Sequence, residues 1–244
     1  FNGTVNANGT SINVTFQYGT SKSYGTTVTA TQSPVSGLMA TSVSYSVSGL
    51  TPNTTYHYRV VGTNQTSTGY GDDVTFTTSR LTVTWDGTAW SPSAPTASDN
   101  VIINGNYNDA GITCNDLTIN SGFQVTFSSN VTVGGNLLVK TGATLINEGT
   151  VSVTGTTTVK QALTGAGNAT PNGRYWYVAS PLTGAISSTF AAAGTNELWN
   201  YDETTHAYSE LTINTSPRAA GPGYGARLGA DQTVSFTGAF TSGT

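Results

Sequence analysis

An internal repeat of twenty residues, between positions 98 and 163, constrains this chain more than any other feature. Within each copy, three short runs of alternating apolar and polar residues are separated by turns of Gly, Asn and Ser, as in DLTIN-SG-FQVTF-SSN-VTVGG. One copy cannot bury its apolar side chains alone, whereas stacked copies can. The positions that match at this spacing are Leu117 with Leu137, Ile119 with Val139 and Val159, Gly122 with Gly142, Val125 with Leu145, Val131 with Val151, and Val133 with Val153.

The repeat predicts a parallel β-solenoid with three strands per coil and successive coils about 4.8 Å apart. A shorter leading coil is expected to use Val101, Ile103, Ile112 and Cys114. Because Cys114 alternates with Ile112, its side chain should point into the solenoid as a small apolar group rather than act as a reactive thiol.

Composition agrees with such a stack and excludes several functions. Only 8% of the 244 residues are charged, and 8 basic against 12 acidic side chains give a net charge of −4. Low charge suits stacked coils, because rows of like charges at that spacing would repel. So few basic residues cannot neutralise a run of phosphates, which excludes nucleic-acid binding. No apolar run reaches the roughly 20 residues of a membrane helix, and the single Cys114 rules out an intrachain disulfide.

Residues 1–79 are predicted to form a β-sandwich, because short alternating runs are separated by turn clusters. The segment GLTPNTTYHYRVVGTN, residues 49–64, resembles the fibronectin type III signature, in which a Leu-x-Pro-x-Thr-x-Tyr corner leads into a Tyr-x-Tyr-x-Val strand. The resemblance implies that Tyr56 is the corner tyrosine, with its hydroxyl bonded to the backbone of residues 50–52. It also implies that the first strand of such a domain is missing, because residues 1–5 look like its second strand.

Residues 80–97 are predicted to be a Trp- and Pro-rich linker that also caps the solenoid. The segment TWDGTAWSPSAPTASDNVIING, residues 84–105, resembles the lead-in to β-solenoid modules of surface proteins from Bacteroidetes-type bacteria. The resemblance implies that Trp85 and Trp90 cover the end of the stack, which would otherwise expose apolar side chains and unpaired backbone.

Residues 164–244 are predicted to form a β-rich, sandwich-like domain that is incomplete. Its pieces GRYWYVASPLTG, NELWNYD, GPGYG and VSFTG resemble, in this order, strands of domains in proteins exported by the type nine secretion pathway. The chain is therefore expected to be all-β, with a fibronectin type III-like sandwich, a short parallel β-solenoid and a C-terminal sandwich-like domain. These resemblances imply an architecture and an export route rather than a chemistry.

The residue types that carry chemistry are few and scattered. His57 and His206 lie in different modules, without the spacing that is typical of a zinc site. The nearest carboxylate pairs are Asp72 with Asp73, Asp202 with Glu203, and Glu197 with Glu210. Turn or edge positions explain these pairs better than glycoside hydrolysis does. No catalytic or cofactor-binding residue is therefore assigned, and the chain is predicted not to be an enzyme.

Two groups of residues remain as binding candidates. Three carboxylates flank the first coil, namely Asp99, Asp109 and Asp116. Ca²⁺ prefers such clustered oxygens, although capping of turn N–H groups explains them equally well. Three consecutive aromatic residues are Tyr175, Trp176 and Tyr177. A strand would direct some of these rings outward, to stack on a sugar or a neighbouring subunit, with burial under the next module as the alternative.

These observations favour a non-catalytic structural or adhesive protein of the bacterial cell surface that builds a stiff β-rod or fibre. The alternatives are a filament subunit that polymerises by β-strand complementation, and a carbohydrate-binding accessory region of a secreted enzyme. The expected partners are further copies, neighbouring domains of the same protein, or a polysaccharide. The uncharged surface, and a start at Phe1 without a leader, favour a mature or excised piece located outside the cell.

Overall fold

The computed structural model describes residues 1–163, 165, 175–184, 190, 197–202, 204–211, 224–228 and 230–240. It divides into two compact units, Phe1–Leu81 and Thr82–Thr244. Both units are built from β-strands, which confirms the all-β prediction. In the part of the chain that is described, no helix has the length and apolar character needed to cross a membrane.

The first unit is a two-layered β-sandwich. One layer pairs β1 with β5, and the other has the order β3-β2-β6-β7, with β4 also on β2 and β8 also on β6. Its inner positions alternate along the strands, so that Val14, Phe16 and Val43 are almost fully buried between the layers. The strands are β1 (Asn2–Asn6), β2 (Ser11–Gly19), β3 (Thr26–Thr29), β4 (Val35–Ser36), β5 (Ala40–Ser44), β6 (Thr55–Thr63), β7 (Thr68–Tyr70) and β8 (Val74–Thr77).

The corner before β6 has the contact that the fibronectin type III resemblance implies. Tyr56 is buried, and the backbone N–H of Thr51 donates a hydrogen bond to its hydroxyl at 3.2 Å. The neighbouring Asn53 has a φ of 48°, in the left-handed region that Asn tolerates better than most residues. A tyrosine hydroxyl therefore bonds to the turn that leads into β6, one of the two longest strands of this sandwich.

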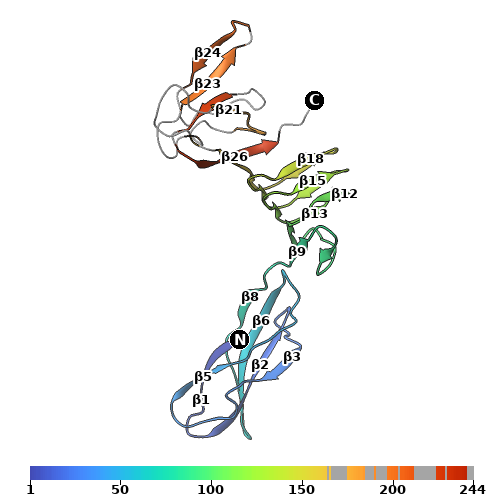
Figure 1. The fold of residues 1–244 in the computed structure, drawn as a ribbon. Helices are drawn as coiled ribbons and strands as arrows, with labels where there is room; N and C mark the ends of the chain where they lie inside the picture. The colour runs from blue at the N-terminus through green and yellow to red at the C-terminus, as the bar shows by residue number, and fades with distance from the viewer. Residues whose placement is uncertain are drawn as a thin grey trace. The chain divides into compact units, whose positions relative to one another are not determined.

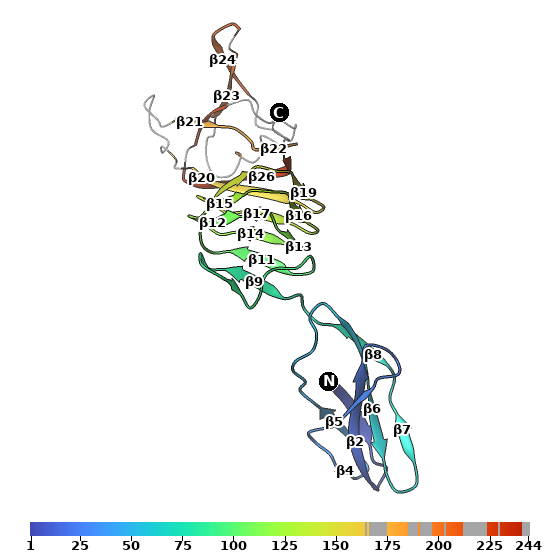
Figure 2. The ribbon, with the colours of Figure 1, turned by 90° about the vertical axis from the view of Figure 1, so that its right-hand side faces the viewer.

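The second unit begins with a parallel β-solenoid of about four turns, as predicted from the repeat. Figure 2 shows its coils stacked from β9 to β20. Its strands form three ladders: β9 (Thr82–Trp85), β11 (Asn100–Ile103), β14 (Leu117–Ile119), β17 (Leu137–Val139) and β20 (Thr157–Leu163); β12 (Tyr107–Asp109), β15 (Gln124–Phe127) and β18 (Thr144–Asn147); and β13 (Thr113–Cys114), β16 (Val131–Val133) and β19 (Val151–Val153).

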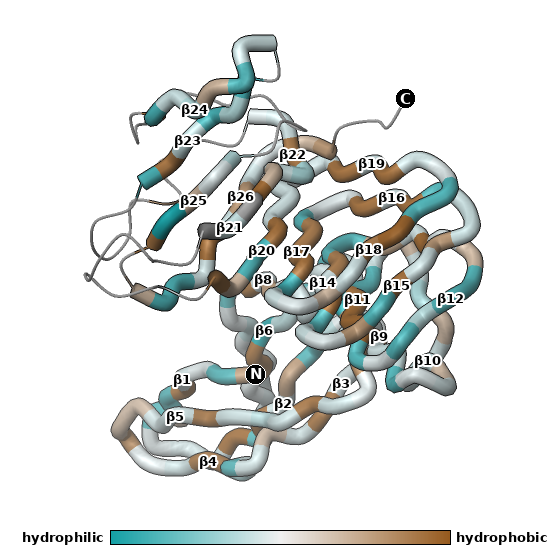
Figure 3. The backbone as a smooth tube through the Cα atoms, turned by 45° about the horizontal axis from the view of Figure 1, so that its top comes forward, coloured by the Kyte–Doolittle hydropathy of each residue, from teal (hydrophilic) through white to brown (hydrophobic). Residues whose placement is uncertain are grey.

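The register of these ladders follows the repeat. Leu117 pairs with Leu137 and Val131 pairs with Val151, so each strand meets its equivalent in the next coil. The leading coil is shorter, since Val101 already pairs with Leu117. Hydrophobic residues recur along β16, β17 and β19 in Figure 3, and the inward-facing side chains form one continuous core.

Glycine is required at the same turn of two successive coils. Gly122 and Gly142 occupy the same place in successive coils and have φ values of 82° and 74°. A side chain is strained in this left-handed conformation, whereas glycine adopts it freely. The glycine column of the repeat therefore reflects a backbone requirement rather than packing.

The segment 80–97, expected as a linker and cap, contributes a further strand to the solenoid sheet. Strand β9 pairs in parallel with β11, with Val83 opposite Val101, and β10 (Trp90–Ser91) folds back on β9. Val83 is fully buried because it continues the inward-facing column of the repeat. The twenty-residue repeat did not predict that β9 joins the sheet, because the turns around β9 differ from those of the later coils.

The C-terminal part continues the same sheet. Strand β20 pairs in parallel with β17 and antiparallel with β26 (Gln232–Phe240), which then pairs with β22 (Leu182–Thr183). A separate four-stranded sheet has the order β21 (Tyr175–Val178), β25 (Tyr224–Arg227), β23 (Glu197–Asp202) and β24 (Ala207–Glu210); three of these strands, β21, β23 and β24, are labelled near the top of Figure 1. A second core, with Leu163, Leu198 and Phe236, receives side chains from both sheets. The architecture is sandwich-like in the described residues.

Candidate interaction sites

An aromatic cluster closes the β9 end of the solenoid core. The ring centroids of Trp85 and Trp90 are 5.3 Å apart, and Trp85 lies edge-on to Tyr107 at 5.3 Å. Tyr107 then contacts Phe127 of the next coil, also at 5.3 Å. The indole N–H of Trp85 donates to the carbonyl of Asn106 at 2.8 Å. Both tryptophans are half-buried and are used in packing, so little of their ring surface is left for a ligand.

The three aspartates of the first coil bind turns of the backbone. Asp99 is 7% exposed and accepts hydrogen bonds from the N–H and hydroxyl of Thr96. Asp109 accepts from the N–H of Ala110, and Asp116 accepts from the N–H of Asn136, each at 2.7 Å. Among the described residues no group of three or more His, Cys, Asp or Glu side chains is placed to hold a metal ion. The calcium site stays a prediction, and turn capping accounts for the geometry.

Cys114 points into the solenoid core and is 1% exposed. Burial, with a smaller contribution from Asp116 and Asp99, raises the pKa of its thiol to about 12. A thiol with this pKa stays protonated at neutral pH and is a poor nucleophile. The residue acts as a small apolar side chain.

The aromatic run Tyr175–Tyr177 lies on β21, which pairs with β25. Trp176 is half-buried and packs against the second core. The side chains of the two flanking tyrosines lie outside the described residues. The half-buried Trp176 favours the packing interpretation over a sugar-stacking platform.

Sequence reasoning missed a more exposed aromatic pair on the β23–β24 hairpin. Tyr201 and Tyr208 face each other across the two strands, with ring centroids 4.9 Å apart and exposed fractions of 40% and 56%. The hydroxyl of Tyr201 lies 3.2 Å from Nδ1 of His206 at the hairpin turn. Such a pair is suited to stacking on a sugar ring. One tyrosine on each side of a polar turn was the available signal.

The first unit carries a polar and aromatic network that was also missed. Asp73 accepts from the hydroxyl of Tyr24 at 3.0 Å and lies 2.9 Å from Nδ1 of His57. The hydrogen bond from His57 holds the pKa of the Asp73 carboxyl below its ordinary value. The guanidinium of Arg59 lies over the rings of Tyr24 and Tyr70, at 4.5 and 4.2 Å. His57 is therefore part of a network rather than a side chain surrounded by solvent.

Two carboxylates of the other pairs, Glu197 and Asp202, make structural contacts. Glu197 forms an ion pair with Arg227, with 3.2 Å between Oε2 and Nη1. Asp202 accepts hydrogen bonds from the N–H groups of Thr204 and Thr205 in the hairpin turn. Glu203 lies outside the described residues. These contacts are the turn and edge roles expected from the sequence.

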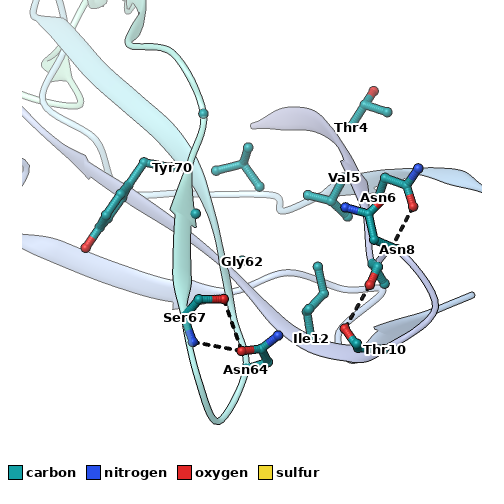
Figure 4. A pocket seen from close by; sticks show the side chains of 14 residues that line it. Thr4, Val5, Asn6, Asn8, Thr10, Ile12, Gly62, Asn64, Ser67 and Tyr70 are labelled. Carbon is teal, nitrogen blue, oxygen red and sulfur yellow. Dashed lines mark hydrogen bonds between the residues drawn. The ribbon is translucent and has the colours of Figure 1, made fainter. Parts of the chain in front are cut away.

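A groove of about 420 Å³ runs along the first unit between β1 and the β6–β7 hairpin (Figure 4). Val5, Ile12 and Val60 supply its half-buried apolar floor. None of the fourteen residues that line it is charged: Thr4, Val5, Asn6, Ala7, Asn8, Thr10, Ile12, Val60, Gly62, Asn64, Ser67, Gly69, Tyr70 and Gly71. An uncharged groove beside a strand edge suits a neutral, extended partner better than an ionic ligand.

Comparison with known protein families, characterised proteins and solved structures found no match for this chain. Its function is therefore inferred from its own residues.

Proposed function

We propose that the chain is a non-catalytic structural or adhesive protein of a bacterial cell surface. The observation that carries this proposal is the use made of the polar corner side chains. Asp116, Asn130 and Asn136 each accept a hydrogen bond from the N–H of the residue twenty positions further on, at 2.7, 2.9 and 2.9 Å. These side-chain oxygens are used to join one coil to the next.

The location outside the cell is supported by surface chemistry and by motifs. Neutral polar residues cover a chain with only 8% charged residues. The type nine export route and the fibronectin type III-like module of the proposal rest on the motifs in residues 49–64, 84–105 and 173–184. A buried, protonated cysteine and turn-capping carboxylates fit a mechanical or adhesive role, because they add stability without reactivity.

Immunogold electron microscopy tests this proposal. Antibodies raised against the purified chain should label intact cells of the producing bacterium at their outer surface, and cells that lack the gene should be unlabelled. Labelling that requires permeabilised cells would contradict a surface location. A hydrolytic or transfer activity that is lost with Asp116→Asn or Asp73→Asn would contradict the non-catalytic role.

A filament subunit is the second candidate. The observation that favours it is the edge of β1, which among the described residues pairs with β5 alone. Exposed edges of this kind template pairing with another chain. Negative-stain images of the purified chain should show filaments that lengthen with protein concentration, whereas discrete particles at every concentration would contradict this candidate.

A further inference from the structure

The β23–β24 hairpin presents different residue types on its two faces. Leu198 of β23 is almost fully buried in the second core, which defines the inward face of that strand. Side chains alternate along a strand, so Trp199 and Tyr201 lie on the outward face. The pairing of the two strands places Glu210 opposite Trp199 on this face. Tyr208 lies opposite Tyr201, so the outward face carries three aromatic residues and one carboxylate.

The exposed pair Tyr201 and Tyr208 differs from the other large exposed side chains. The two rings contact each other and are 40% and 56% exposed. Tyr70 is also exposed, but its ring lies against the guanidinium of Arg59. The remaining large exposed hydrophobic residues in the described part of the chain carry no ring: Leu38, Met39, Val74 and Ile146. An exposed aromatic pair of this kind is typical of a surface that binds a partner.

Hydrogen-bonding groups lie beside these rings. The hydroxyl of Tyr201 is 3.2 Å from Nδ1 of His206, a contact that orients its ring. Glu210 lies two residues from Tyr208 on the same face, about 7 Å along β24. Its carboxylate is exposed and has no hydrogen-bond or ion-pair partner among the described residues. A carboxylate in this position can accept strong hydrogen bonds from the hydroxyl groups of a ligand.

We propose that this outward face binds a neutral β-glucan, a chain of β-linked glucose units. The glucose rings of such a chain have equatorial substituents, so each ring shows apolar C–H groups on its two faces and hydroxyl groups at its rim. Aromatic rings suit the former, and the carboxylate of Glu210 suits the latter. A stable protein–protein interface takes about 20 residues or more from each partner, far more than the outward side chains of this hairpin.

The charges of the hairpin favour a neutral chain over an anionic one. Residues 197–210 contain no lysine or arginine, and their acidic residues are Glu197, Asp202, Glu203 and Glu210. Glu197 is paired with Arg227, and the other acidic residues would repel a polysaccharide that carries carboxylate or sulfate groups. A neutral glucan does not meet this repulsion.

The tilt between the two tyrosine rings favours a single soluble chain over a crystalline surface. Their planes are inclined by 46°, and their centroids are 4.9 Å apart. Rings that do not share a plane cannot both lie flat on one crystal face. They can meet successive sugar rings of a chain that curves, as β-1,3-linked glucans do and the flat ribbons of β-1,4-linked cellulose do not. The expected ligand is therefore a soluble β-1,3-glucan.

This inference rests on the adhesive part of the proposed function, because it names the chemical class of the partner. The two can fail separately. Surface labelling without glucan binding would contradict the inference and leave the adhesive role standing. Glucan binding by a chain that is found inside cells would support the binding face and contradict the surface location.

Isothermal titration calorimetry of the full chain with laminarin, a soluble β-1,3-glucan, measures the binding. Tyr208→Thr should weaken it about tenfold or more, because it removes one stacking ring but keeps a residue that suits a strand. Tyr208→Phe keeps the ring and should retain most of the affinity. Tyr70→Thr removes an exposed tyrosine of the first unit and, as the matched control, should leave the affinity unchanged.

Tryptophan fluorescence gives a second readout that leaves the tyrosine pair intact. Trp199 shares the outward face, whereas Trp176 packs against the second core. Laminarin should therefore change the emission of the wild type and of Trp176→Phe, but not that of Trp199→Phe. The proposal is overturned by a wild type that does not bind laminarin, by equal affinities of the wild type and Tyr208→Thr, or by equal binding of laminarin and polygalacturonate, an anionic chain.

Discussion

The sandwich of the first unit and the solenoid of the second are both all-β, but their strands find hydrogen-bond partners in different ways. In the solenoid each strand meets its equivalent one coil later, and corner residues such as Asn130 and Asn136 repeat the same hydrogen bond. In the sandwich each strand depends on a particular distant partner, and contacts such as His57 with Asp73 occur once. The solenoid therefore repeats one set of packing and hydrogen-bond contacts in successive coils. The sandwich instead needs a different set of contacts for each strand, and one edge of β1 is left without a partner strand among the described residues.

The largest predicted effect on stability comes from core substitutions, which should destabilise one unit and leave the other unchanged. Phe127→Ala should lower the free energy of unfolding of the second unit by about 3–5 kcal/mol, because the ring is fully buried and leaves a cavity. All four tryptophans lie in that unit, so tryptophan fluorescence during urea unfolding follows it alone. Phe16→Ala, in the sandwich core, is the matched control. It should leave the tryptophan transition in place, and an equal shift would contradict independent units.

Two adjacent glycines test how closely the coils approach. A Cβ at Gly135 would collide with the carboxylate of Asp116 and crowd the carbonyl of Asn115, whereas one at Gly134 would have its nearest neighbour at 3.7 Å. Gly135→Ala should therefore destabilise the second unit by about 1–3 kcal/mol through overpacking. Gly134→Ala should leave its urea midpoint nearly unchanged. Equal midpoints for the two variants would refute the close stacking.

The hydrogen bonds between corner residues of successive coils predict a smaller loss of stability. Asn136→Ala removes the oxygen that accepts the N–H of Thr156, and should cost about 1 kcal/mol. Asp116→Asn, which keeps an acceptor oxygen at the equivalent corner of the preceding coil, is the control and should leave the stability nearly unchanged. The urea midpoint of the second unit measures both, and equal midpoints for Asn136→Ala and Asp116→Asn would argue against the contribution of these hydrogen bonds.

The smallest effect is a pH dependence confined to the sandwich. The His57 hydrogen bond lowers the pKa of Asp73 from its ordinary value of 3.8. A carboxyl whose folded pKa is depressed stabilises the fold above its unfolded pKa, and this contribution disappears as pH falls through the folded value. The sandwich should therefore lose stability below about pH 4. Asp73→Asn should reduce that loss, as followed by the part of the tyrosine signal change that tryptophan fluorescence does not share, and an unchanged acid profile would contradict the network.

The repeat made the solenoid predictable in detail. Leu117, Leu137 and Thr157 align in the ladder at the spacing read from the sequence, because each coil repeats the local environment of the one before. The leading coil and the inward direction of Cys114 followed from alternation. The rung at Val83 was not predicted, since the turns around it do not repeat.

The sites were less predictable than the fold. Trp85 and Trp90 were expected at the end of the stack and pack there, but their contact with Tyr107 depends on a fold-back that no local pattern specifies. The cluster of Tyr24, Arg59 and Tyr70 joins residues that are distant in sequence. Alternation places His57 and Arg59 on one face of β6, yet it cannot say which loops cover that face.

The claim that a twenty-residue period builds the solenoid of the second unit can be tested by removing one period. Deleting residues 126–145 joins Val125 to Ile146, and Val125 then takes the place of Leu145, its partner in the ladder. Far-ultraviolet circular dichroism and tryptophan fluorescence should show a folded chain with one coil fewer and a lower urea midpoint. Deleting residues 126–135 breaks the register and should unfold the solenoid. Equal loss of structure in the two deletions would contradict the account.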